Sequence, residues 1–202
     1  VNQNLALISL NLITGQIGKK GAGPFSLTGQ PNAMGGREVV GMSSLLAAHK
    51  KLASPEDRKA VADHWGVESL PSKPGKSATK IFEGLDSGEI KAVWIICTNP
   101  LTSMPDARKV EKALEKARFV VVQDISKNNA AIPYADLVLP AAGWGEKEGT
   151  LTNSERRISY LKPFFKQPGE ALPDGEILMS FARQMGIKGF DYQGGSSVFA
   201  EH

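Results

Sequence analysis

The segment from Lys91 to Pro140 restricts the possible folds more than any other part of this chain. Residues Lys91–Cys97 are apolar on both faces, which is typical of a central strand in a parallel sheet. Pro105-Asp106 then opens an amphipathic helix that runs to Ala117, and a second strand, Phe119–Gln123, follows directly. This order fits a right-handed strand–helix–strand crossover. The sequence therefore predicts an α/β fold with a mostly parallel sheet.

Capping and turn residues divide the rest of the chain into further elements. A helix packed between layers is predicted over residues 1–14, and a glycine-rich loop over residues 15–41. Ser54 and Ser77 are expected to cap two helices, which end at Gly66 and near Gly88. The other predicted elements are a strand over 136–139, extended pieces near 149–152 and 157–161, and a final helix over 174–185.

Polar side chains follow the predicted strands, and in open α/β sheets ligands bind beyond the carboxyl ends of the strands. Asn99 and Ser103 come after the first strand and precede a helix, a setting that suits a phosphate. Gln123 and Asp124 end the second strand, where a carboxylate can accept hydrogen bonds from a ribose or a base. Local turns and caps are the alternative explanation. The third predicted strand is followed by Pro140–Gly143. Three strand ends with polar or turn-forming residues together favour a site for part of a dinucleotide-like cofactor.

Several kinds of site are disfavoured. No GxGxxG follows Cys97, so the glycine fingerprint of nicotinamide-binding folds is absent. Cys97 is the only cysteine, which excludes disulfides and CxxC metal sites, and we expect it to pack in the core rather than act as a nucleophile. The three histidines lack metal-ligand spacing, so no metal ligand is assigned. The net charge is only +3 and the basic residues are scattered among acidic ones, which argues against a nucleic-acid-binding surface. No apolar run is long enough for a membrane span.

One glycine-rich segment, Gly29–Glu38, contains an arginine, Arg37. Glycines let the backbone approach a ligand closely, and an arginine held in such a loop can receive a small anion. The residues alone favour a simpler interpretation, in which Arg37 is an exposed arginine on a turn.

Four blocks of sequence resemble a known family. Residues Gly23–Glu38 resemble a loop of prokaryotic molybdenum nitrate reductases. Three later blocks resemble the wider family that binds molybdopterin guanine dinucleotide, in the family's order: WIICTNP (94–100), VVVQD (120–124) and YADLVLPAAGWGEKEGTLTNSERR (134–157). The resemblance covers nearly the whole chain. It implies a Rossmann-like three-layer domain of the formate dehydrogenase/DMSO reductase type.

The resemblance assigns roles to residues at matching positions. Asn99 and Ser103 would contact the dinucleotide after the first strand. Gln123 and Asp124 would hold its nucleoside part, and Asp174 would meet the guanine.

Two further residues would serve the reaction centre, because Gln30 would lie near the pterin and Arg37 would sit by the molybdenum and guide nitrate. At the third strand end, Ala141 and Ala142 stand where the family often has Ser or Thr. A hydroxyl contact there is therefore not expected.

The resemblance also implies a larger catalytic subunit, of which residues 1–202 form the central cofactor-binding domain. Residues 1–50 would form an N-terminal helix and active-site loop, and 77–186 the Rossmann-like core. The family's iron–sulfur cysteine cluster, molybdenum ligand and C-terminal barrel are not in this sequence. The parent would bind bis-molybdopterin guanine dinucleotide with molybdenum and a 4Fe-4S cluster, whereas the isolated chain is expected to be apo and inactive.

The reaction implied is the two-electron reduction of nitrate to nitrite by oxygen-atom transfer. Partners would be nitrate, the remaining domains of the subunit and an electron donor protein or reductase subunit. Resemblance to the assimilatory branch implies the cytoplasm, with a periplasmic relative as the alternative. Formate dehydrogenases share the scaffold, but Gln30-Pro31 with Arg37-Glu38 favours nitrate. A non-catalytic module of the same fold is the third alternative, and Gln123-Asp124 with Arg37 argues against it.

Overall fold

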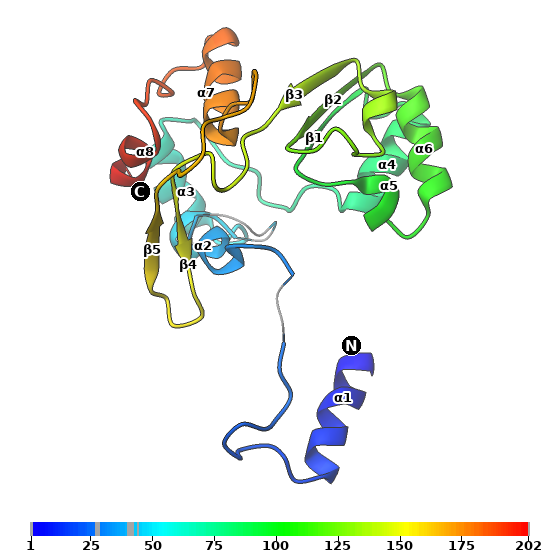
Figure 1. Cartoon of the computed structure of the whole chain (residues 1–202), viewed down its shortest axis with the longest axis vertical. Coiled ribbons are helices and arrows are strands. Elements are labelled where there is room, and N and C mark those ends of the chain that lie inside the picture. The colour runs from blue at the N-terminus through cyan, green and yellow to red at the C-terminus, as the bar shows by residue number, and fades with distance from the viewer. Residues whose placement is uncertain (1, 27–28, 40–42, 44, 202) are drawn as a thin grey trace. The chain divides into compact units, whose positions relative to one another are not determined.

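The structure is a computed structural model that describes residues 2–26, 29–39, 43 and 45–201. The chain divides into two compact units, Val1–Ala33 and Met34–His202, and each is described by itself. The first unit begins with α1 (Asn2–Ile13), the dark blue helix of Figure 1, and this confirms the predicted helix. No residue of α1 is buried. Within the described residues of the first unit no other element covers this apolar helix, so the expected packing between layers remains a prediction.

The second unit carries the remaining elements. The helices are α2 (Ala33–Glu38), α3 (Pro55–Trp65), α4 (Ala78–Ser87), α5 (Pro100–Ser103), α6 (Ala107–Lys116), α7 (Asp174–Gln184) and α8 (Gly195–Glu201), with short 3-10 helices η1 (Ala47–His49) and η2 (Ile132–Tyr134). The strands are β1 (Ala92–Ile96), β2 (Phe119–Asp124), β3 (Leu137–Pro140), β4 (Gly149–Thr152) and β5 (Ile158–Leu161). In the described part of the chain, no helix is long and apolar enough to cross a membrane.

Most predicted elements are present, and the caps explain their bounds. The Ser54 hydroxyl accepts a hydrogen bond from the Asp57 amide at 3.2 Å, and Gly66 ends α3 in the left-handed conformation. Ser77 precedes α4 as predicted, but its side chain makes no capping bond. The glycine-rich segment is not all loop, because α2 forms after Pro31. Helices α5 and α8 were also not predicted.

The strands β1, β2 and β3 form a parallel sheet in that order, which confirms the predicted α/β class. In the register, Val121 pairs with Trp94 of β1 and with Leu137 of β3. Among the described strands β2 is central and β1 is at the edge, so our expectation of a central first strand was wrong. β1 is apolar on both faces for another reason: Ile95 packs in the core on one face, while Trp94 meets Phe181 of α7 edge to face, with ring centroids 5.1 Å apart.

The main core lies between this sheet and helix α6. Ile95, Val120 and Val122 of the sheet pack with Val110 and Leu114 of α6, and Val122 is fully buried. Figure 1 shows α4 and α6 together on one side of the sheet. This layer fixes the sheet from one face and leaves the carboxyl ends of its strands free for other contacts.

The segment before α7 returns to the carboxyl edge of the parallel sheet. Ala141 forms a parallel bridge with Leu172, and the Ala142 amide donates to the Leu172 carbonyl at 2.8 Å. Helix α7 begins two residues later, at Asp174, and reaches β1 at Phe181. The first turn of α7 therefore lies at the carboxyl edge of the sheet.

Between β3 and α7, the predicted extended pieces form an antiparallel hairpin. Thr152 of β4 pairs with Ile158 of β5, and Gly149 pairs with Leu161. The turn that joins them contains Arg156, whose φ of 59° lies in the left-handed region. Such a φ is uncommon for a residue other than glycine.

The core predicts a large effect of Leu114→Ala, because Leu114 is only 2% exposed. We expect a loss of about 3 kcal/mol in the free energy of unfolding, since the change leaves a cavity against the sheet. Leu178→Ala in α7 is the matched control, because Leu178 is 41% exposed, and its cost should stay below about 1 kcal/mol. Urea unfolding followed by circular dichroism measures both. Equal losses in the two variants would contradict this description of the core.

Candidate functional site

Two of the predicted site residues, Gln123 and Asp174, are in direct contact at the carboxyl edge of the sheet. Gln123, the residue before the last one of β2, has no exposed surface, and its Nε2 donates to Asp174 Oδ1 at 2.7 Å. The Gln123 Oε1 atom is buried and has no hydrogen-bond partner among the described residues. Because a buried acceptor without a donor is costly, a ligand donor placed there would be bound favourably.

The Asp174 carboxylate is surrounded by donors. Its Oδ2 is paired with Lys147 Nζ, and its Oδ1 also accepts from Cys97 Sγ at 3.3 Å. Burial raises the pKa of Asp174, but hydrogen bonds from Lys147, then Gln123 and Cys97, outweigh burial and leave the pKa below its ordinary value. Asp174 therefore stays ionised at neutral pH. Lys147 was not predicted, because it meets Asp174 only through the return of the chain to the sheet edge.

Cys97 does not pack in the core as we expected, because it is exposed at the end of β1. Although the residue is exposed, partial desolvation of its sulfur, followed by the hydrogen bond to Asp174, raises the pKa of Cys97 to about 11. A thiol with this pKa is almost fully protonated at neutral pH, which argues against a nucleophile.

After β1, Asn99 and Ser103 are held differently. Asn99 Oδ1 is buried without a hydrogen-bond partner in the described part of the chain. Ser103 is exposed, and its hydroxyl donates to the Asn99 carbonyl at 3.0 Å. Asn99 therefore offers an unused acceptor next to the sheet edge, whereas the Ser103 contact is the local helix bond that the simpler interpretation predicts.

Asp124 is engaged by its own loop. Its Oδ1 accepts from the Ser126 amide at 2.9 Å, and its Oδ2 accepts from Asn129 Nδ2 at 2.6 Å. Asn129 is buried and also donates to the Thr98 carbonyl at 2.8 Å. Asn129 thus joins the loops after β1 and β2, a role that no local pattern of the sequence indicates.

The third strand end uses its backbone donors internally. The Ala141 amide donates to the Asp124 carbonyl at 3.0 Å, and the Gly143 amide donates to Glu146 Oε2 at 2.7 Å. Ala142 is fully buried and pairs with Leu172. The segment after β3 therefore stabilises the carboxyl edge of the sheet through its own hydrogen bonds. The unused acceptors, Asn99 Oδ1 and Gln123 Oε1, lie at the ends of β1 and β2.

Arg37 belongs to a second cluster, on α2. It lines a cavity of about 390 Å³ together with Met34, Glu38, Leu45, His49 and Arg156. Glu38 pairs with His49 and with Arg156, and hydrogen bonds from His49 and then Arg156 hold the pKa of Glu38 below its ordinary value. No hydrogen bond or ion pair is found for Arg37 with another described residue.

Gln30 lies in the first unit, on a bend where its side chain is exposed. The structure therefore brings Gln123 and Asp174 together with Asn99 and Asp124 near the same edge, while Arg37 occupies a separate cavity. Across the described residues, no group of three or more His, Cys, Asp or Glu side chains is placed to hold a metal ion.

The raised pKa of Cys97 predicts slow alkylation. With its pKa moved from 9.0 to about 11, Cys97 should react with iodoacetamide at pH 8 about a hundredfold more slowly than a thiol of ordinary pKa. The rate should rise as the pH approaches 11. Asp174→Asn removes a nearby negative charge and should speed the reaction, which mass spectrometry can follow. Reaction of the unaltered chain as fast as a free thiol at pH 8 would contradict the assignment.

Comparison with known proteins relates this chain to molybdopterin oxidoreductases. The sequence model of the family described as molybdopterin oxidoreductase matches residues 3–184. A nitrate reductase of Synechocystis is 45% identical over 97% of this chain. The assimilatory nitrate reductase catalytic subunit of Bacillus subtilis is 37% identical over 96% of it, and the F420-dependent formate dehydrogenase subunit alpha of Methanocaldococcus jannaschii is 38% identical over 97%.

The match covers only part of these relatives. The chain spans 28% of each of these three proteins. Among solved structures, acetylene hydratase from Pelobacter acetylenicus is similar in fold, with a TM-score of 0.54, 20% identity, and coverage of 61% of this chain and 18% of the hydratase. Since the family model matches residues 3–184, nearly the whole chain, this chain belongs to the molybdopterin oxidoreductase family.

Proposed function

We propose that this chain is the central cofactor-binding domain of the catalytic subunit of a molybdenum-dependent nitrate reductase. In this role residues 1–202 hold one molybdopterin guanine dinucleotide, with 77–186 as the Rossmann-like core and 1–50 as the helix and active-site loop. The observation that carries the proposal is the Gln123–Asp174 pair at the sheet edge, with a buried acceptor left over on Gln123.

The edge fits the nucleotide end of such a cofactor. The Watson–Crick edge of guanine carries two adjacent N–H donors, and an ionised carboxylate such as Asp174 is a matching acceptor. Gln123 Oε1 and Asn99 Oδ1 are buried acceptors that further N–H or O–H donors of the ligand would satisfy. Lys147 beside Asp174 supplies positive charge for a diphosphate.

The remaining assignments extend this edge. Asp124 and Ser103 would border the nucleoside and phosphate parts, and Gln30 would lie by the pterin. Asp124 and Ser103 already make polar contacts, and the Gln30 side chain is exposed. These residues contribute orientation rather than chemistry, because none is placed as an acid, base or nucleophile.

Arg37 is the residue proposed to receive nitrate. Its guanidinium is always charged, and its planar N–H groups match two oxygens of a small oxoanion. The molybdenum centre, when bound, would supply the two-electron chemistry and the oxygen-atom transfer. The chain's own part is to hold the anion at Arg37 and to fix the cofactor through the sheet edge.

Nitrate is favoured over formate as the substrate. Three nitrate reductases, from Synechocystis, Shewanella frigidimarina and Klebsiella oxytoca, are 44–45% identical to this chain, while the formate dehydrogenase relative is 38% identical. Gln30-Pro31 and Arg37-Glu38 support the same choice.

We further propose an assimilatory enzyme of the cytoplasm that carries bis-molybdopterin guanine dinucleotide and a 4Fe-4S cluster and takes electrons from a donor protein or reductase subunit. The assimilatory relative of Bacillus subtilis supports this, and a periplasmic nitrate reductase of Desulfovibrio desulfuricans, also 37% identical, represents the alternative. Fractionation of cells that make the full-length protein distinguishes the two compartments.

Arg37→Gln in the full-length protein tests the substrate assignment. Loss of a charge-assisted contact to the anion should lower kcat/KM for nitrate by about 10- to 100-fold. Arg37→Lys keeps the charge but loses the planar fork, so we expect an intermediate value. Steady-state assays at equal molybdenum content measure this, and an Arg37→Gln enzyme with unchanged kcat/KM would refute the role.

The isolated 202-residue chain should fold around its sheet but neither retain the cofactor nor reduce nitrate, because it spans only 28% of its Synechocystis relative. Elemental analysis of chain purified from cells that make the cofactor should show molybdenum far below one atom per chain. The full-length protein from the same cells is the control. Stoichiometric molybdenum or nitrite production by the isolated chain would contradict this prediction.

A further inference from the structure

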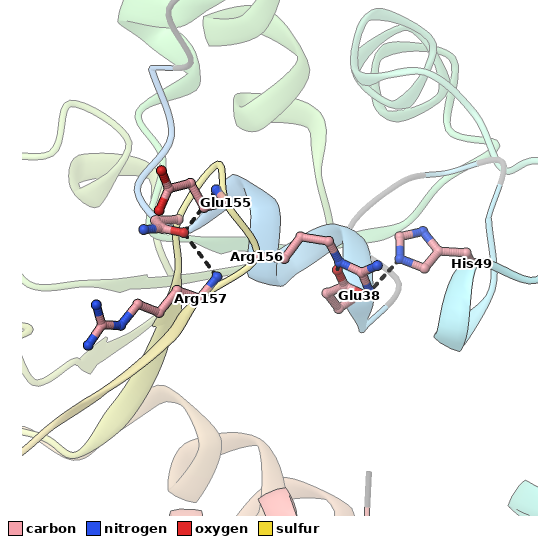
Figure 2. A network of polar contacts seen from close by, with 6 residues as sticks. Glu38, His49, Glu155, Arg156 and Arg157 are labelled. Atoms are coloured by element: carbon pink, nitrogen blue, oxygen red, sulfur yellow. Dashed lines mark hydrogen bonds and ion pairs between the residues drawn. The ribbon is translucent and has the colours of Figure 1, made fainter.

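Two side chains, those of Arg156 and His49, meet the carboxylate of Glu38, the last residue of α2. Arg156 donates to its carboxylate through two nitrogens, Nε to Oε1 at 3.0 Å and Nη2 to Oε2 at 3.1 Å. His49 Nε2 lies 2.7 Å from Glu38 Oε2. Figure 2 shows Arg156 and His49 approaching the carboxylate from different segments of the chain. The negative charge of Glu38 is therefore neutralised by a partner 118 residues further along the sequence.

The backbone is shaped to deliver these partners. His49 and Arg156 both have a φ of 59°, in the left-handed region that residues other than glycine seldom adopt. In the hairpin turn, Asn153 Oδ1 accepts from the Glu155 and Arg157 amides, both at 3.0 Å. This turn directs the Arg156 side chain to Glu38, whereas the neighbouring Arg157 side chain points away (Figure 2).

Arg37 precedes Glu38 and lines the same cavity of about 390 Å³. In the described part of the chain, no ion pair occupies the Arg37 guanidinium. The charged groups of the lining are Arg37 and Arg156, both positive, and Glu38, with His49 as the titratable neighbour. Arg37, Arg156 and Glu38 together carry one net positive charge, which exists only because Arg156 offsets Glu38.

We propose that Arg156 is a positioning residue for the anion site at Arg37: by neutralising Glu38, it keeps the Arg37 guanidinium free and the cavity attractive to a small oxoanion. This inference rests on the proposed function, in which that oxoanion is nitrate. Without Arg156, the ionised Glu38 carboxylate would compete for Arg37 and repel the anion. The lowered pKa of Glu38, due to His49 and then Arg156, means that the carboxylate remains charged and needs an offset throughout the neutral range.

A purely structural role for the Arg156–Glu38 contact is the competing explanation. The Arg156 side chain is 69% exposed, and exposed ion pairs contribute little to stability. The two explanations differ in a measurable way. If the contact only holds the hairpin against α2, removing either partner should impair the site, and removing both should not help. If it offsets charge, removing Glu38 should relieve the loss of Arg156.

The test compares four variants of the full-length protein for KM and kcat with nitrate. Arg156→Gln should raise KM about fivefold and leave kcat nearly unchanged, as expected for an unmasked negative charge near the anion. Glu38→Gln alone should not raise KM, and the Glu38→Gln/Arg156→Gln double variant should return KM to near the unaltered value. Arg157→Gln is the matched control, because it removes the same charge from the same turn without a contact to Glu38, and it should change KM less than twofold.

Two further measurements keep the outcome clear. Arg156→Lys should retain most of the nitrate affinity, and added salt should shrink the Arg156→Gln effect because it screens charge. A double variant no better than Arg156→Gln, or equal effects of Arg156→Gln and Arg157→Gln, would overturn the inference while leaving the proposed function in place. If the unaltered full-length protein reduced no nitrate, the proposed function itself would fail.

Discussion

The hydrogen bond from Gln123 to Asp174 joins the end of the central strand β2 to the first turn of α7 at 2.7 Å, with Gln123 fully buried. Much of the candidate site depends on this contact. It holds the helix start at the carboxyl edge of the sheet, and it orients the Gln123 amide so that Oε1 faces away from Asp174 without a partner in the described chain. A buried amide satisfied on one side only is unstable unless something else supplies a donor. The Gln123–Asp174 hydrogen bond thereby leaves Gln123 Oε1 as an open acceptor for a donor from a ligand.

Sequence reasoning was accurate where the structure depends on local rules. The Ser54 cap, the Gly66 stop and the amphipathic α6 follow from interactions within a few residues, and the strands β1 to β3 follow from apolar runs. It failed where the position of an element depends on packing against a segment that is distant in the sequence. The apolar faces of β1 indicated a central strand, yet Trp94 is covered by Phe181, which lies far along the chain.

The residues of the candidate site also fall into those that the sequence predicted and those that it did not. Gln123 and Asp174 were expected near one ligand by resemblance, and the structure puts them in contact across 51 residues of sequence. Lys147, Asn129 and Arg156 carried no recognisable signal, because each acts through a partner brought close only by the fold. Cys97 was expected inside because cysteine behaves as a small hydrophobe, but it ends an edge strand with a left-handed φ of 51°, and this turns it to the surface.

The sheet edge around Asp174 and the cavity beside Arg37 both receive a cation from the same stretch of the chain. Asp174 at the sheet edge is paired with Lys147, and Glu38 beside the cavity is paired with Arg156, and both cations come from the stretch between β3 and β5. The consequences differ because the proposed function gives the two carboxylates different ligands. At the sheet edge an ionised acceptor would suit the N–H donors of the proposed nucleotide, and Lys147 keeps Asp174 charged. Beside Arg37 a bare carboxylate would oppose an anion, so Arg156 must cancel Glu38. Under the proposed function, this one segment would therefore adjust both a site for hydrogen-bond donors and a site for an anion.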